Sequence, residues 1–125
     1  MKTVVNTDKA PGAIGPYSQG IRAGGFLFVS GQMPVNPLNN SVVEGGIEEQ
    51  ALQVLENIKA ILSSEGLTMN HVVKTTVFLK DLEDFQVVNS IYGQYFKEQA
   101  PARACVQVVK LPKDVMVEIE AIAVL

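Results

Sequence analysis

The sequence predicts an α+β fold in which two helices cover one face of a mixed sheet. Three observations support this: a turn-rich N-terminal third with short strand candidates, two later segments with helical periodicity, and alternating β-branched segments between and after them. The chain has 125 residues, which suits one domain over residues 1–125 and is too short for two well-packed cores.

The N-terminal third alternates strand candidates with turns. Residues 3–6, 18–22 and 26–30 are the strand candidates, and Pro and Gly residues separate them. Gly24 and Gly25 lie between the second and third candidates. Since glycine readily takes the positive φ angles of tight hairpin turns, we expect these two strands to pair as a hairpin.

The first helix is expected to begin at Ile47, where apolar residues start to recur at three- and four-residue steps. Glu48 and Glu49 suit the positive N-terminal end of a helix, and Gly66 is suited to a left-handed residue that ends one. The apolar stripe consists of Ile47, Ala51, Val54, Leu55, Ile58, Ile61 and Leu62.

A second helix is expected after Asp81, which can cap it, and before Pro101, which terminates it. Its apolar stripe consists of Phe85, Val88, Ile91, Tyr92, Tyr95 and Phe96. Strands are expected at residues 72–80, 103–109 and 115–124, with a turn at 111–114 between the last two. The element order is therefore ββ(β)–α–β–α–β–β, with both helices on one face of the sheet.

Two of the predicted strands are apolar on both sides. Alternation in residues 115–124 places Val117, Ile119, Ala121 and Ala123 opposite Met116, Glu118, Glu120, Ile122 and Val124. In residues 72–80, Val73, Val77 and Leu79 are expected opposite Val72 and Phe78. Because two helices cover only one face, the other would expose an apolar patch that monomers seldom tolerate. We therefore expect a symmetric homo-oligomer that buries this face.

Composition excludes several classes of protein. The formal net charge of −3 and the lack of a basic cluster argue against electrostatic binding of nucleic acid. No apolar run approaches the roughly 20 residues of a membrane-spanning helix, and the N-terminus does not resemble a signal peptide. A single cysteine, Cys105, and a single histidine, His71, exclude a disulfide framework and a thiolate- or histidine-rich metal site. We expect a soluble, acidic, single-domain protein of a reducing compartment.

Arg103 and a glutamate on the next strand are the first candidates for chemistry. Alternation puts Arg103, Cys105 and Gln107 on one face, and it puts Glu118 and Glu120 together on the following strand. If these strands pair as a hairpin, the arginine can bind a substrate carboxylate while a glutamate takes a proton from water. A structural Arg–Glu ion pair is the alternative, and for unselected pairs it is the commoner one.

The remaining reactive side chains favour structural roles. Cys105 has no activating histidine nearby in sequence, so a small buried side chain is more common there than a nucleophile. Tyr17, Tyr92 and Tyr95 are more often packing residues than catalysts, and His71 has no visible set of co-ligands. Phosphate-binding glycine motifs are absent from the sequence.

Seven motifs, in order along essentially the whole chain, resemble the RidA/YjgF family, and in particular its imine deaminases. They are IGPYSQG at 14–20, SGQ at 30–32, VKTTVF at 73–78, VN at 88–89, PARACV at 101–106, LPKDV at 111–115 and VEIEAIA at 117–123.

This resemblance implies a chorismate-mutase-like fold and a homotrimer whose sheets surround a central barrel, with three sites in clefts between subunits. It implies hydrolysis of 2-iminobutanoate and 2-iminopropanoate to 2-oxo acids and ammonia. Such imines are released by pyridoxal-phosphate enzymes, which connects the family to isoleucine biosynthesis and to control of metabolite damage. The family uses no cofactor and no metal.

The resemblance also implies roles for particular residues. Arg103 would bind the substrate carboxylate, and Glu118 would position and activate the attacking water. The thiol of Cys105 would take no part in catalysis, because its backbone, with Gly31, would contact the imine end. The other residues implied to line the pocket or shape its rim are Tyr17, Ser30, Asn89 and Pro112.

Two other function classes remain open at the level of sequence. The same trimeric clefts would suit a regulator that binds a small carboxylate without turning it over. A translation-inhibiting ribonuclease, an activity ascribed to some relatives, fits the acidic composition poorly. A chaperone-like role is also ascribed to relatives, and the residues neither support nor exclude it.

Overall fold

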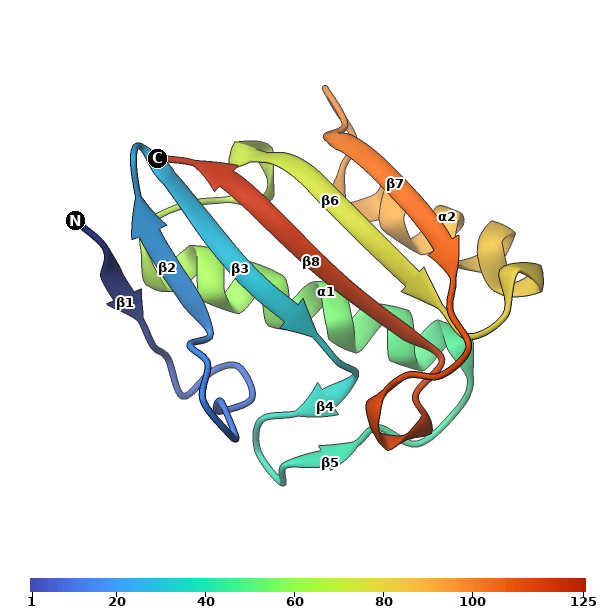
Figure 1. Cartoon of the computed structure of the whole chain (residues 1–125). Coiled ribbons are helices and arrows are strands. Elements are labelled where there is room, and N and C mark those ends of the chain that lie inside the picture. Colours follow the sequence, from blue (N-terminus) through green and yellow to red (C-terminus); the bar gives the residue numbers. More distant parts are fainter.

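The computed structural model describes residues 1–125 and contains one six-stranded sheet with two α-helices on the same side of it (Figure 1). The strand order across the sheet is β1-β2-β3-β8-β6-β7. These elements are β1 (Thr3–Val5), β2 (Gly20–Ala23), β3 (Phe26–Gln32), α1 (Ile47–Ser64), β6 (Val72–Leu79), α2 (Phe85–Tyr95), β7 (Ala102–Gln107) and β8 (Val117–Val124). The α+β prediction with both helices on one face is confirmed.

The last two strands do not form the hairpin that the sequence suggested. Instead, β8 is inserted between β3 and β6 and runs antiparallel to both, while β7 pairs in parallel with β6 at the edge of the sheet. The turn-like Pro112–Asp114 segment is a short 3-10 helix within a longer crossover. By contrast, the expected hairpin between β2 and β3 is present, and its two turn glycines have φ values of 58° and 83°.

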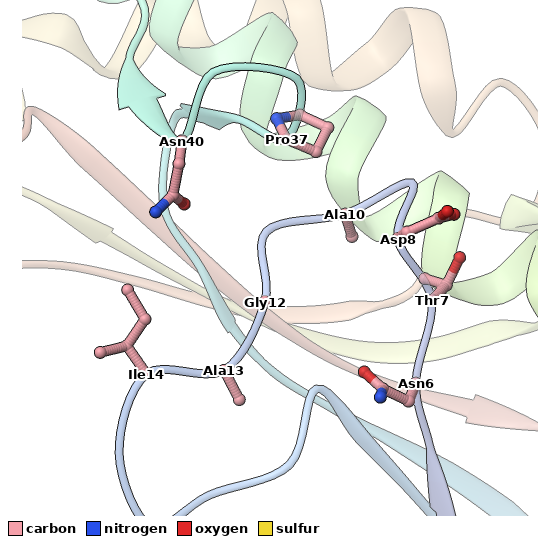
Figure 2. A pocket seen from close by; sticks show the side chains of 9 residues that line it. All are labelled: Asn6, Thr7, Asp8, Ala10, Gly12, Ala13, Ile14, Pro37 and Asn40. Carbon is pink, nitrogen blue, oxygen red and sulfur yellow. The ribbon is translucent and has the colours of Figure 1, made fainter.

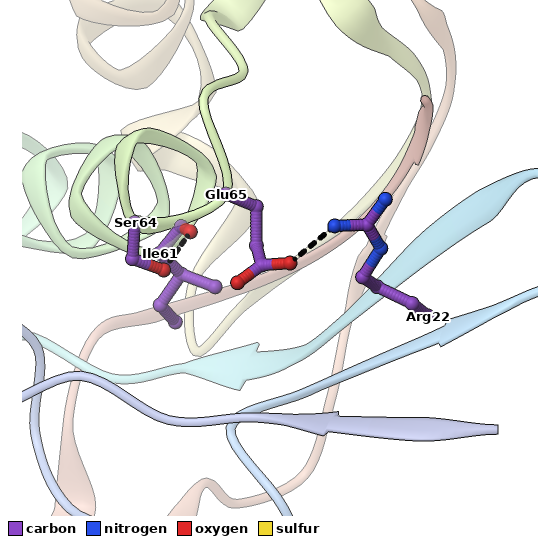
Figure 3. Close-up of polar contacts among 4 residues, drawn as sticks. All are labelled: Arg22, Ile61, Ser64 and Glu65. Atoms are coloured by element: carbon purple, nitrogen blue, oxygen red, sulfur yellow. Dashed lines mark hydrogen bonds and ion pairs between the residues drawn. The ribbon is translucent and has the colours of Figure 1, made fainter.

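Helix α1 ends through a Schellman motif at Gly66, whose φ is 73°. The Gly66 amide donates to the Ser63 carbonyl at 3.1 Å, and the Leu67 amide donates to the Leu62 carbonyl at 2.9 Å. Beside this motif, the Glu65 carboxylate forms a 2.7 Å ion pair with the Arg22 guanidinium on β2 (Figure 3). The ion pair ties the end of α1 to the outer strands of the sheet.

Helix α2 is preceded by a 3-10 turn, Leu82–Asp84, that Asp81 caps by accepting a 2.9 Å hydrogen bond from the Glu83 amide. The predicted cap at Asp81 is therefore confirmed, with one extra turn before the helix proper. Helix α2 ends at Tyr95, and its buried residues are Val88, Ile91 and Tyr92.

The two faces of the sheet differ in what covers them. The helices bury one face in a core of 23 residues that includes Val117, Ile119 and Val77. The other face carries partly exposed apolar side chains with no element packed over them: Val4, Phe26, Phe28, Val106 and Val124. The sequence prediction of a second, apolar face is confirmed for β8.

One detail of the β6 prediction is wrong. Val72, not Val73, lies buried on the face that carries Val77 and Leu79. The reason is a shift in register between Val72 and Lys74 relative to β8, which breaks the two-residue alternation at the start of the strand.

A small two-stranded sheet, β4 (Val35–Asn36) with β5 (Ser41–Val42), was not predicted. It follows β3 and leads to α1, and the Asn57 side chain of α1 holds it by donating to the Met33 and Val35 carbonyls at 3.1 and 2.9 Å. Neither α1 nor α2 combines the length and the apolar character that crossing a membrane requires.

Candidate functional site

The residues expected to form the site fall into two groups within the chain. The first, here called the arginine group, is Asn89, Arg103 and Cys105 on α2 and β7. The second, here called the bulge group, is Tyr17, Ser30, Gly31 and Glu118, from the loop before β2 and from β3 and β8. Pro112 begins the 3-10 helix whose next residue, Lys113, lines the same cavity as Tyr17 and Gly31.

In the arginine group, three side chains of α2 hold the Arg103 guanidinium. Its carbon lies 4.9 Å from the centre of the Tyr92 ring and 5.5 Å from that of Phe85. One of its nitrogens donates to the Asn89 amide oxygen at 2.7 Å. Because positions i, i+4 and i+7 of a helix share a face, Phe85, Asn89 and Tyr92 form one cradle for the arginine.

Nothing within the chain neutralises the charge of Arg103. The two ion pairs of the chain join Arg22 to Glu65 and Lys80 to Asp114. The alternative of a structural Arg–Glu pair within the chain is therefore wrong for Arg103. A guanidinium that is held in place, exposed and unpaired is suited to bind an anion such as a carboxylate.

Cys105 lies two residues further along β7 and is partly buried against the core. Burial raises the pKa of its thiol, and the positive charge of Arg103 opposes that rise without cancelling it. At neutral pH the thiol is therefore protonated and a poor nucleophile. This agrees with the expectation that the sulfur takes no part in catalysis.

The bulge group is built on a break in the pairing of β3 with β8. Val29 pairs with Ala121 and Gln32 pairs with Ile119, so β3 carries one residue more than β8 over this stretch. The extra residue falls at Ser30–Gly31. Two hydrogen bonds from Ser30 to the loop before β2 hold the bulge in place. The Ser30 amide donates to the Gln19 carbonyl at 3.0 Å, and the Ser30 hydroxyl donates to the Ser18 carbonyl at 2.5 Å. Bulges of this kind often redirect the chain next to functional sites.

Glu118 lies directly against Gly31. A Cβ atom at position 31 would stand 2.5 Å from Oε2 of Glu118 and 3.0 Å from its Cδ, so only glycine leaves room for the carboxylate in this position. Burial raises the pKa of Glu118, and the negative charge of Glu120 adds to the rise. A carboxylate with a raised pKa is a stronger base than an ordinary glutamate and is suited to accept a proton from water.

A cavity of about 310 Å³ opens beside this pair of residues. Its walls include Tyr17 and Gly31, the apolar side chains of Ile14, Met33 and Val35, and Lys113. The Tyr17 side chain is half exposed, and its hydroxyl accepts a long 3.4 Å hydrogen bond from the Ile14 amide. The cavity is large enough for a small organic substrate with an apolar side chain.

The two groups are not brought together within one chain. Arg103 pairs with Thr75 of β6, which faces the helices, while Glu118 pairs with Phe78, which faces the opposite side. The hypothesis that a hairpin places Arg103 and a glutamate side by side in the same chain is therefore wrong. The physical reason is that β7 and β8 both pair with β6 and not with each other.

Sequence reasoning assigned Phe85 and Tyr92 to packing and missed their contact with Arg103. Their spacing around Asn89 was the available signal, since it places a polar side chain between two aromatic ones on the same face of α2. No group of three or more His, Cys, Asp or Glu side chains lies close enough together to hold a metal ion.

Comparison with known proteins gives a consistent result. Residues 7–125 match the family model described as endoribonuclease L-PSP. A RutC family protein of Pyrococcus horikoshii is 55% identical over 98% of this chain and 98% of its own length. The structure of a Rid family protein from Yersinia pestis, YyfA, superposes with a TM-score of 0.97 at 48% identity and covers 100% of both chains.

A third relative carries a ligand. The structure of TdcF from Escherichia coli with bound serine has a TM-score of 0.93 and 47% identity and covers 98% of each chain. TdcF is named as a candidate reactive intermediate deaminase. Relatives of this chain therefore include a protein that binds a small amino acid.

Proposed function

The chain belongs to the RidA/YjgF family, the family of the endoribonuclease L-PSP model, and from this membership we propose that it is an imine deaminase. Its substrates would be small 2-imino acids, 2-iminobutanoate and 2-iminopropanoate above all, which it would hydrolyse in the cytoplasm to 2-oxo acids and ammonia. The observation that carries the proposal is the cradled, unpaired guanidinium of Arg103 together with the half-buried carboxylate of Glu118.

Each residue has a defined part in this reaction. Arg103 binds the substrate carboxylate through two parallel hydrogen bonds, and Asn89 fixes the orientation of the guanidinium. The protonated imine carbon is already electrophilic, so the protein has only to orient it and to supply water. Glu118 takes a proton from that water as the oxygen adds to the carbon, and it passes this proton to the nitrogen of the resulting carbinolamine. As the carbon–nitrogen bond breaks and ammonia leaves, the hydroxyl gives its proton to Glu118 and becomes the carbonyl of the 2-oxo acid, and Glu118 then releases the proton to solvent. No bond to Cys105 is formed.

We propose that the site is completed between subunits of a homotrimer. Since Arg103 and Glu118 face opposite sides of one sheet, one chain cannot present both to a single small substrate. The apolar face that the helices leave uncovered gives the subunits a surface on which to assemble. In a closed ring each subunit would supply the arginine group to one site and the bulge group to the next.

The serine bound to TdcF supports the class of substrate. Serine has the 2-amino-carboxylate backbone to which a 2-imino acid corresponds, and it has a short side chain. The cavity beside Gly31 would take the substrate side chain, with Ile14, Met33 and Val35 as its apolar walls.

A coupled assay tests the proposal. Threonine dehydratase generates 2-iminobutanoate in the presence of semicarbazide, and formation of the semicarbazone is followed with and without this protein. We expect the wild type to suppress trapping, and Arg103→Ala and Glu118→Gln not to suppress it. If the wild type left trapping unchanged with several imino acids, the protein would instead be a ligand-binding regulator. If Glu118→Gln kept full activity, Glu118 would not be the base.

A further inference from the structure

Residues 7–14 form a loop, here called the strap, that lines two neighbouring hollows of the molecule. The first is the 310 Å³ cavity, to which the strap contributes Pro11, Gly12 and Ile14. The second is a more open hollow of about 510 Å³, which shares Gly12, Ile14 and Asn40 with the first. Figure 2 shows the strap as one continuous run of chain beside this second hollow, with Pro37 and Asn40 on a separate segment across from it. The strap therefore forms part of the wall of the candidate site.

Few contacts hold this wall. No backbone group of residues 7–14 bonds to the backbone of a strand or helix. Ala10 is the only strap residue whose side chain belongs to the buried core. The long hydrogen bond from the Ile14 amide to the Tyr17 hydroxyl holds the far end. The position of the strap consequently depends on a small number of side-chain contacts.

Most of those contacts come from one residue, Gln19, which is only 2% exposed. Its amide nitrogen donates to the carbonyls of Thr7 at 2.9 Å, Ala10 at 3.2 Å and Pro11 at 2.8 Å. Its amide oxygen accepts from the Thr7 amide at 2.7 Å. Since the amide nitrogen carries two N–H groups, one of them is shared between two of these carbonyls, and one buried side chain thus contacts four backbone groups of the strap.

Gln19 also contacts the opposite wall of the cavity. Its own backbone carbonyl accepts the hydrogen bond of the Ser30 amide, and Ser30 begins the bulge that places Gly31 against Glu118. Gln19 therefore holds the strap through its side chain and the bulge through its backbone carbonyl. A shift of the Gln19 side chain would move the strap relative to the carboxylate without unfolding the sheet.

We propose that Gln19 is a positioning residue of the imine-binding site. It holds the strap at the distance from Gly31, on the other wall of the cavity, that fits the side chain of a small imino acid. This proposal rests on the proposed function for its substrate. Its structural half, that Gln19 fastens the strap, stands without it. Because the chemistry occurs at Arg103 and Glu118, loss of Gln19 should weaken substrate binding more than it slows turnover.

Gln19→Glu is the sharpest test, since glutamate has the same shape but loses the donor. Once ionised, its carboxylate would face three carbonyl oxygens and would release the strap. At lower pH the protonated acid regains one O–H donor and should restore part of the attachment. The ratio of KM in the variant to KM in the wild type should therefore rise with pH, which a purely structural defect would not cause.

Two readouts and two further variants complete the experiment. Tryptic cleavage after Lys9, followed by mass spectrometry without substrate, measures exposure of the strap. Ala10→Gly removes the contact of the strap with the hydrophobic core and leaves Gln19 intact. It therefore provides the same test if Gln19→Glu fails to fold. Val72→Ala is the stability control, because this buried residue pairs with Ala123 at the end of β8 remote from Glu118.

We expect Gln19→Glu at pH 8 to be cleaved after Lys9 about tenfold faster than the wild type, with KM raised about tenfold and kcat changed less than threefold. Ala10→Gly should shift both readouts in the same direction, and Val72→Ala should shift neither.

Unchanged cleavage in both strap variants would overturn the fastening role, and faster cleavage with an unchanged KM would overturn the positioning role. A wild type without imine hydrolysis would overturn the proposed function, and with it the positioning role, while the cleavage rates would still decide the fastening role.

Discussion

Arg103 and Glu118 lie on opposite faces of the same six-stranded sheet. Arg103 sits on the helix-covered side, stacked on Tyr92, and Glu118 sits on the uncovered side against Gly31. A reaction that needs both side chains at one small molecule therefore needs two copies of the chain. The proposed reaction therefore predicts that activity requires assembly, and the two can be tested together.

Mixing two inactive variants should restore activity. Arg103→Ala keeps Glu118, and Glu118→Gln keeps Arg103. After the two are refolded together in equal amounts, random assembly gives sites in which both residues are intact at about a quarter of the wild-type number. We expect about that fraction of the wild-type rate in the coupled assay.

The control for this experiment is the same mixture without refolding, which should stay inactive until subunits exchange. Mass spectrometry of the intact assembly reports the exchange directly. Mixed assemblies that form and remain inactive would place both residues of each site in a single subunit, which would contradict the site between subunits.

Gly31→Ala should separate activity from stability. Its added methyl group would meet the flexible end of Glu118, which can move aside, so the free energy of unfolding should fall by less than about 1 kcal/mol. The displaced carboxylate no longer holds the water in place, and kcat should fall by about two orders of magnitude. Denaturant unfolding and the coupled assay measure the two effects. Gly93→Ala on the exposed side of α2 is the control, because a Cβ there meets no atom within 4 Å.

The activity should depend on pH through Glu118. Burial and the charge of Glu120 raise the pKa of this carboxyl, and only its ionised form accepts a proton. Activity is therefore present above that raised pKa and is lost as the pH falls through it. Glu120→Gln removes one cause of the rise, so its profile of kcat/KM should extend to lower pH than that of the wild type. If kcat/KM of the wild type and of Glu120→Gln fell at the same pH, a group other than Glu118 would control the loss of activity in acid.

Asn89→Ala should weaken substrate binding. The variant loses the 2.7 Å hydrogen bond that orients the Arg103 guanidinium but keeps the stacking on Tyr92. A hydrogen bond to a charged group contributes on the order of 1.5 kcal/mol, which corresponds to about a tenfold rise in KM with little change in kcat. Gln94→Ala on the exposed side of α2 should behave as the wild type. An equal fall of kcat in both would point to general damage of the helix.

Cys105→Ala should retain at least about half of the wild-type kcat, since the thiol is protonated at neutral pH and makes no bond in the proposed reaction. For the same reason iodoacetamide should label the native protein slowly. A loss of more than about tenfold in kcat, with the fold preserved by circular dichroism, would show that the sulfur takes part in catalysis.

The sequence predicted the elements whose causes are local. Helix α1 could be foreseen because its apolar stripe and its Gly66 stop signal lie within one stretch of chain. The Asp81 cap was visible for the same reason. In both cases the residues that decide the structure are near neighbours in sequence.

What the sequence could not predict was the choice of partner for β7 and β8. Each strand had a clear alternating pattern, but alternation does not say which strand lies alongside. The irregular register at Val73 and the bulge at Ser30–Gly31 were not predicted for a related reason, since each is defined by its pairing with β8, which lies far away in the chain. Strand alternation nominated Arg103 with either Glu118 or Glu120, and the resemblance to a family selected Glu118 and added Gly31. The contact of Phe85 and Tyr92 with Arg103 was missed, although their spacing around Asn89 was visible in the sequence.

The contact between Gly31 and Glu118 has a consequence for how this sequence can change over evolutionary time. A side chain at position 31 and the carboxylate at position 118 occupy the same space, so the cost of losing the glycine depends on which residue stands at 118. A lineage that first replaces Glu118 with a smaller residue frees position 31 to drift, and any later return to glutamate is then blocked by the larger side chain there. Under the proposed mechanism, loss of Glu118 would in this way become hard to reverse, and a larger residue at position 31 would mark a descendant that no longer uses this carboxylate.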